Sequence, residues 1–170
     1  MTAADSTPNV NPSTDEESAG ILIEAQEALV QGRLVESIDC FSRVLEKNPS
    51  HQMALFSRGT AFLRNGQFDQ AHADFNQVLS THPRKEKILC ARGNVYMVQE
   101  NFEKALEDFN KALDYNPQYA TAYLNRAIVF DRLGESELAE EDREVGMRIQ
   151  KQMSHAYLET QGIVFQQTPN

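Results

Sequence analysis

The chain has 170 residues, of which 41% are hydrophobic, and its formal net charge at pH 7 is −9. This length and apolar content are enough for one domain with a continuous hydrophobic core. Phosphate binding needs clustered Lys and Arg, and the one short basic run, from Arg84 to Lys87, is interrupted by Glu86, so nucleic acid is not an expected partner.

The first segment, residues 1–13, is rich in Thr, Ser, Pro, Asn and Ala and has almost no large apolar side chain. It buries too little apolar surface to offset the entropy lost on ordering, so we expect a disordered N-terminal tail. The segment has neither the basic start nor the apolar run of a signal peptide. No later stretch reaches the ~18 apolar residues of a membrane helix, so membrane insertion is not expected.

The middle of the chain repeats with a period of 34 residues, most visibly at Pro49, Pro83 and Pro117. A spacing that is kept this often indicates an array of like supersecondary units. Further columns recur in step: Ala25, Gly59 and Gly93; Ala28, Phe62 and Tyr96; Gly32, Gly66 and Glu100; Leu34, Phe68 and Phe102; Ser37, Ala71 and Ala105; Phe41, Phe75 and Phe109; Leu45, Leu79 and Leu113. A fourth copy has Ala127, Phe130, Gly134, Ser136, Ala139, Arg143 and Met147, with Lys151 in place of the proline.

Each unit contains two amphipathic stretches with apolar residues at helical spacing. The glycine between them suits a left-handed helix end, and the proline ends one unit because it disfavours helix at the residue before it. The small residue of one helix allows close approach, and the aromatic residue of the other fills the space beside it. From Glu137 to Glu159 there is no proline, which predicts one long final helix with Gly146 as a packing glycine.

This small–aromatic–small–aromatic–Pro pattern resembles the tetratricopeptide repeat family over residues 18–151. The resemblance implies an all-α fold: an α-solenoid of about four helix–turn–helix repeats with a C-terminal capping helix. We expect a domain over residues 14–160, with repeats at about 18–51, 52–85, 86–119 and 120–150 followed by the capping helix. Residues 161–170 form a C-terminal tail.

In this family the first helix of each repeat lines a concave groove, so the resemblance implies that a partner's peptide or helix binds there. The groove residues by register are Leu22, Gln26, Phe56, Thr60, Leu63, Arg64, Lys87, Asn94, Met97, Leu124, Asn125, Ile128 and Arg132, with Leu29, Cys90 and Asp131 among them. Asn94 and Asn125 each offer a donor and an acceptor, which suits an extended main chain. For Leu29, Leu63 and Met97, core packing and groove lining remain open alternatives.

One subfamily grips the carboxylate end of chaperones with two Lys, two Asn and one Arg. The matching positions here are Leu22, Gln26, Ser57, Lys87 and Ala91, of which only Lys87 agrees. We therefore expect no such clamp, and a partner held by apolar contacts instead.

Catalysis is not expected, because the chain has no phosphate loop, metalloprotease motif or nucleophile elbow. Its four histidines are spread along the array, and its two cysteines, Cys40 and Cys90, suit neither a metal site nor a disulfide. We expect no cofactor and no metal, and free thiols favour a cytoplasmic location.

Three functions remain open at this stage. The first is a small adaptor or scaffold, or a co-chaperone, that binds a protein segment in the groove. The second is a chaperone that shields an apolar segment of a client, as bacterial secretion chaperones do. The third is a self-associating structural protein, since the apolar Ile163, Val164 and Phe165 have three candidate docking places: the cap, another copy and the groove. Acidic residues Glu140, Glu141, Asp142 and Glu144 favour a solvated face over an interaction patch.

Overall fold

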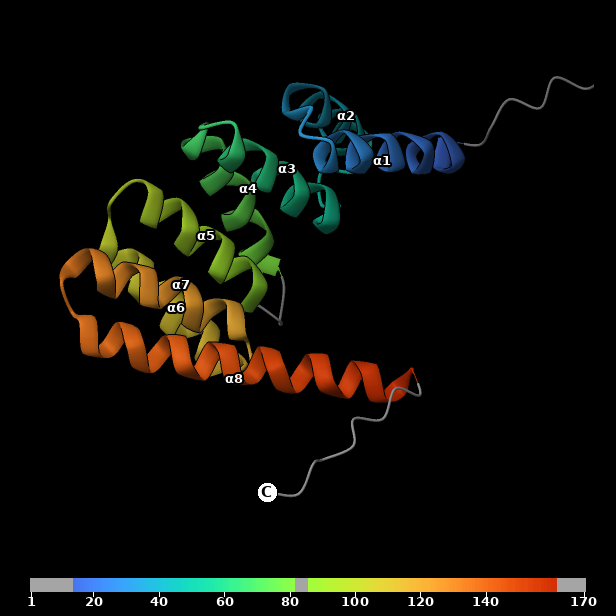
Figure 1. The fold of residues 1–170 in the computed structure, drawn as a ribbon. Helices are drawn as coiled ribbons and strands as arrows, with labels where there is room; N and C mark the ends of the chain where they lie inside the picture. Colours follow the sequence, from blue (N-terminus) through green and yellow to red (C-terminus); the bar gives the residue numbers. More distant parts are fainter. Residues whose placement is uncertain (1–13, 82–85, 162–170) are drawn as a thin grey trace, which may run out of the picture. The chain divides into compact units, whose positions relative to one another are not determined.

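The computed structural model describes residues 14–81 and 86–161, and every regular element among them is an α-helix. The tails predicted for residues 1–13 and 161–170 lie outside the described residues, except for Gln161. The helices (Figure 1) are α1 Thr14–Val30, α2 Leu34–Lys47, α3 Gln52–Arg64, α4 Phe68–Thr81, α5 Glu86–Val98, α6 Phe102–Tyr115, α7 Ala120–Leu133 and α8 Ser136–Thr160.

The chain divides after Gln67 into two compact units, each with its own packing. In the first unit, α2 packs against both α1 and α3, and α1 also touches α3. In the second unit each helix from α4 to α8 packs against the next, and α5 also touches α7. The helices thus follow one another as helix–turn–helix units, which confirms the predicted all-α repeat fold with a C-terminal capping helix.

The contact between small and aromatic residues forms the centre of each helix pair. The side chains of Phe41, Phe75 and Phe109 are completely buried. A Cβ placed on Gly93 in α5 would lie only 2.6 Å from Cε1 of Phe109 in α6. Because glycine leaves that space empty, the aromatic ring packs directly on the backbone of the neighbouring helix.

A second small-residue column lies at the start of each second helix. Ala71, Ala105 and Ala139 are completely buried there, and Ser37 takes the same place in α2. The Ser37 hydroxyl donates to the carbonyl oxygen of Ala25 in α1, at 3.0 Å. The buried hydroxyl is therefore satisfied by the backbone of the helix against which it packs.

The turn within each repeat has a left-handed residue at the same position. Gly32, Gly66 and Gly134 have φ values of 77°, 76° and 80°, as predicted for helix-ending glycines. In the third copy Glu100 adopts φ 58° at this position, although a side chain disfavours this conformation. The turn geometry therefore follows the repeat even where glycine is missing.

The long final helix is confirmed as α8, which runs from Ser136 to Thr160. Gly146 is a packing glycine: a Cβ there would lie 2.9 Å from Cδ2 of Leu124 in α7. Ile149 is the last buried side chain of α8, and residues 150–157 are exposed. Figure 1 shows this C-terminal half of α8 running on beyond the start of α7.

We predict that Gly93→Ala destabilises the second unit, whereas Gly20→Ala does not destabilise the protein. Both changes gain helix propensity of up to about 1 kcal/mol. At Gly20 an added Cβ meets nothing within 4 Å, but at Gly93 it collides with the buried Phe109 ring. Overpacking of this kind costs about 1–3 kcal/mol, which reverses the sign of the change. Urea unfolding of the two variants measures the difference, and equal stabilisation by both would contradict the packing described.

Candidate functional site

The predicted groove residues all fall on the first helices of the repeats. These helices are α1 and α3 in the first unit and α5 and α7 in the second. Within each unit the two first helices touch one another, so each unit presents one face built from a pair of them. The two faces are described in turn.

On the α1–α3 face, two of the predicted polar residues make contacts between the helices. The Gln26 amide nitrogen donates to Sδ of Met53 at 3.4 Å, and Arg64 Nη1 donates to the carbonyl oxygen of Leu29 at 2.8 Å. The Thr60 hydroxyl instead donates to the carbonyl oxygen of Phe56 in its own helix, at 2.9 Å. Arg64 and Thr60 are therefore held by the backbone.

The apolar predicted residues of this unit are half-buried. Leu22 lines a hollow of about 710 Å³ together with Val44 and His51. Leu63 and Phe56 are half-buried on α3. The first unit thus keeps part of its predicted apolar surface accessible.

On the α5–α7 face, the two predicted asparagines lie side by side. The Asn125 amide nitrogen donates to Oδ1 of Asn94 at 2.7 Å and to Sγ of Cys90 at 3.4 Å. Both asparagines are half-buried, whereas Cys90 is buried. Sequence register placed these two asparagines on one face, and the structure adds that they are hydrogen-bonded to each other.

The Cys90 thiol is not an activated nucleophile. Burial raises its pKa to about 11, and the hydrogen bond from Asn125 opposes that shift only in part. A reactive thiol needs a lowered pKa, so this group acts as a small buried side chain and a hydrogen-bond acceptor.

The remaining predicted residues of the second unit differ in their availability. Ile128 is 46% exposed on α7, and Lys87 is exposed at the start of α5. Met97 packs against the core cluster that contains Phe109, and Leu124 packs against Gly146. These two side chains therefore serve helix packing before they serve any ligand.

Arg132 and Asp131, at the end of α7, form ion pairs. Arg132 Nη2 lies 2.7 Å from Oε1 of Glu100, and its guanidinium lies 5.7 Å from the centre of the Phe102 ring. Asp131 Oδ2 accepts from Arg143 Nη2 at 2.6 Å. The polar edge of this face is thus occupied by contacts within the protein.

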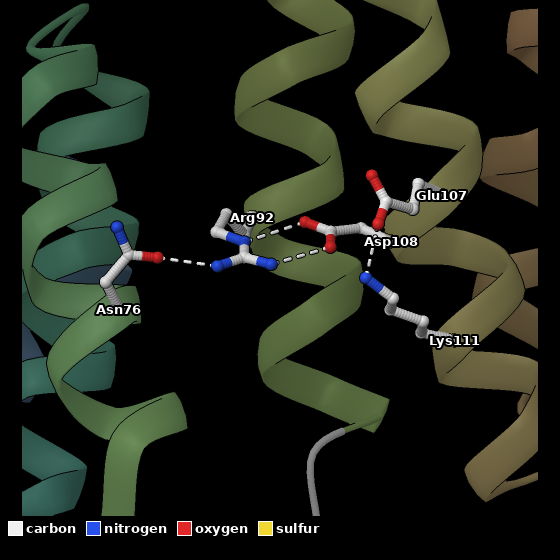
Figure 2. Close-up of polar contacts among 5 residues, drawn as sticks. All are labelled: Asn76, Arg92, Glu107, Asp108 and Lys111. Carbon is white, nitrogen blue, oxygen red and sulfur yellow. Dashed lines mark hydrogen bonds and ion pairs between the residues drawn. The ribbon is translucent and has the colours of Figure 1, made fainter.

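A buried arginine–aspartate arrangement, absent from the predicted site, repeats along the second unit. Figure 2 shows Arg92 held by both carboxylate oxygens of Asp108, at 2.8 and 2.7 Å, and by Oδ1 of Asn76, at 2.6 Å. One repeat later, Arg126 makes the same bonds to Asp142, both at 2.7 Å, and to Asn110, at 2.6 Å.

The signal for this arrangement was the same 34-residue period, since each arginine, aspartate and asparagine is followed by its like in the next repeat. The guanidinium of Arg92 has a raised pKa, chiefly because of its hydrogen bond to Asp108. Its donors are engaged by the protein, so the arrangement is structural. It also corrects the interpretation of Asp142: that residue is buried and paired with Arg126, and does not belong to a solvated acidic face.

No group of three or more His, Cys, Asp or Glu within residues 14–81 and 86–161 is placed to hold a metal ion. Among the same residues, no helix is both long enough and apolar enough to cross a membrane.

Family models match most of the repeat region. One described as "Tetratricopeptide repeat" matches residues 24–86, and one described as "TPR repeat" matches residues 93–134. No curated protein is significantly similar in sequence to this chain.

Several solved structures have a similar fold. MamA residues 41 to the end, from Desulfovibrio magneticus RS-1, is 20% identical, with a TM-score of 0.71 over 81% of this chain and 80% of that one. The first TPR of Spaghetti (RPAP3), bound to the HSP90 peptide SRMEEVD, is 19% identical, with a TM-score of 0.65 over 74% and 99%. The Arabidopsis OM64 TPR domain is 21% identical, with a TM-score of 0.63 over 67% and 94%. At these identities the likeness concerns the fold alone.

We predict that Arg92→Met lowers the free energy of unfolding by about 3 kcal/mol, because it leaves the buried Asp108 carboxylate without its cation. The Arg92 side chain is 20% exposed and that of Asp108 is 3% exposed, which puts the loss at the lower end of the range for buried pairs. Arg132→Met is the control, since its pair with Glu100 is 56% and 68% exposed and contributes at most about 1 kcal/mol. Urea unfolding separates the two, and similar losses in both variants would contradict a structural role for the buried pair.

Proposed function

The chain belongs to the tetratricopeptide repeat family, and from this premise we propose that it is a protein-binding module. Tetratricopeptide repeats generally mediate protein–protein interaction. In this proposal the protein is a small adaptor or scaffold, and it holds a peptide or helix of a partner on the faces of its first helices. The role is binding, with no catalytic step.

The observation that supports this most strongly is the amide pair on the α5–α7 face. Asn125 uses its amide nitrogen for Asn94 and Cys90, which leaves its carbonyl oxygen as an acceptor. Asn94 uses its carbonyl oxygen, which leaves its amide nitrogen as a donor. Neither of these two groups has a hydrogen-bond partner among the described residues. One donor beside one acceptor matches the alternating groups of an extended main chain.

The apolar side chains around this pair favour an apolar partner segment. Ile128, exposed on α7, lies one helical turn from Asn125. The Spaghetti (RPAP3) domain is bound to a peptide with acidic residues, SRMEEVD. Of the positions that would hold a terminal carboxylate, only Lys87 here is basic. We therefore propose a neutral or apolar segment as the ligand, and no carboxylate clamp.

A chaperone that shields an apolar segment of a client is the second candidate, with a co-chaperone role as a variant of it. It is favoured by large apolar side chains that are exposed in the first unit, such as Ile23 at 60% and Val30 at 84%. A chaperone suppresses aggregation of its client at equal molar ratio, whereas an adaptor does not. Self-association through these side chains is the third candidate, and light scattering over a range of concentrations tests it.

The cytoplasm is the proposed compartment, because Cys40 and Cys90 are free thiols and such thiols persist in a reducing environment. We also propose the domain limits expected from the sequence, with the repeat array over residues 14–160.

We predict that Ile128→Glu abolishes capture of the partner, while Leu133→Glu leaves it intact. The two side chains lie on the same helix and are equally exposed, at 46% and 47%, but Leu133 stands at the far end of α7, away from the asparagine pair. A buried carboxylate without a cation opposes an apolar ligand by several kcal/mol, so binding falls at least tenfold.

Quantitative pull-downs with the parent and both variants provide the first measurement. Proteins that are retained by the parent and by Leu133→Glu but lost from Ile128→Glu are the partners, and titration of a peptide from one of them confirms the loss of affinity. Equal recovery with all three forms would contradict the proposed face.

A further inference from the structure

A hollow of about 600 Å³ lies in the second unit, between the start of α7 and the C-terminal half of α8. Its wall includes Tyr119 and Thr121 near the start of α7, and Met153, Ser154, Tyr157 and Leu158 on α8. None of its lining residues is charged, although the chain as a whole has a net charge of −9. The hollow is therefore suited to an uncharged occupant with apolar side chains.

The α8 side of this hollow is unusually exposed for its composition. Met153 is 62% exposed and Tyr157 is 65% exposed, and the two lie one turn apart on the same face. Elsewhere on α8 the apolar side chains face the repeat core, as Ile149 does at 5% exposure. Two large apolar side chains beside an uncharged hollow gain free energy when they are covered.

The chain that follows α8 has the sequence of a helix-ending motif that reverses direction. Gln161 is the C-cap of α8, so Gly162 occupies the next position, where a left-handed glycine commonly ends a helix. In this motif the second residue after the cap packs against the third or fourth helical residue before it. These positions are Ile163 on one side, and Leu158 and Tyr157 on the other.

We propose that the segment Ile163–Phe165 folds back from Gly162 and covers this hollow within the same molecule. Ile163 packs on Leu158 and Tyr157, and Phe165 reaches Met153. The proposal does not rest on the proposed partner-binding function, since it concerns another face of the second unit. Its consequence is that an apolar segment of a partner reaches this hollow only by displacing the chain's own segment.

The lengths of the two segments agree with this arrangement. From Thr160 back to Met153 is seven residues of helix, or about 10 Å at 1.5 Å per residue. From Gln161 to Phe165 is four residues, which span up to about 14 Å when extended. Residues 162–167 carry no charge, and their apolar residues are followed by Gln166 and Gln167. The amides of these glutamines match those of Asn116 and Gln118 in the wall of the hollow.

Methyl-labelled methionine in the full chain provides the test, because Met153 lines the hollow and Met147 does not, although Met147 is 49% exposed on the same helix. We predict that Phe165→Ala shifts the NMR signal of the Met153 methyl group, since the ring current of Phe165 is lost. The Met147 signal stays in place. Thr168→Ala, a change beyond the apolar segment, is the matched control and leaves both signals unchanged.

Spectra at several protein concentrations identify the molecule that supplies the segment. A Met153 shift that is the same at every concentration supports docking within one molecule. A shift that appears only at high concentration means that a second copy supplies the segment, and this overturns the proposal. An unchanged Met153 signal in Phe165→Ala also overturns it, because the hollow is then open to Phe165 in neither way.

Discussion

The close approach of two helices, made by a small residue on the first and an aromatic ring on the second, is the contact on which each repeat depends. In the second unit the Phe109 ring occupies the space that a side chain at Gly93 would need. Because each helix pair is held by contacts between neighbours, the core is a stripe that runs along the array. The opposite sides of the first helices take no part in that stripe, which leaves them available to bind other molecules.

Polar groups fall into two classes in this structure, and the difference carries the functional argument. Arg92 and Asp108 are hydrogen-bonded to each other in a buried pair, so they hold neighbouring helices together. The Asn94–Asn125 pair keeps one donor and one acceptor without a partner in the described part of the chain. A satisfied buried network stabilises a fold, whereas an accessible unused donor and acceptor provide recognition. The α5–α7 face is therefore the better candidate for a binding site.

Much of the fold could be predicted from the sequence because its packing is local and recurs every 34 residues. The period predicted the helices, the left-handed turns and the long α8, and the Glu100 turn shows that the repeat prevails where the residue type does not favour it. The site was predictable only as a set of positions. Register placed Met97 and Leu124 on first helices, but whether such side chains face a groove or a neighbouring helix depends on rotamers and on partners such as Gly146. The Arg92–Asp108 pair was present in the same period but was hidden because only apolar columns were compared.

A double-mutant cycle with Gly93→Ala and Phe109→Leu tests the central contact most directly. The smaller leucine removes the ring atoms that an alanine side chain would meet, so the second change should relieve part of the cost of the first. The account predicts a favourable coupling of at least about 1 kcal/mol between the two substitutions in the free energy of unfolding. Losses that add to within about 0.5 kcal/mol would mean that the two residues do not constrain one another, and would contradict the account.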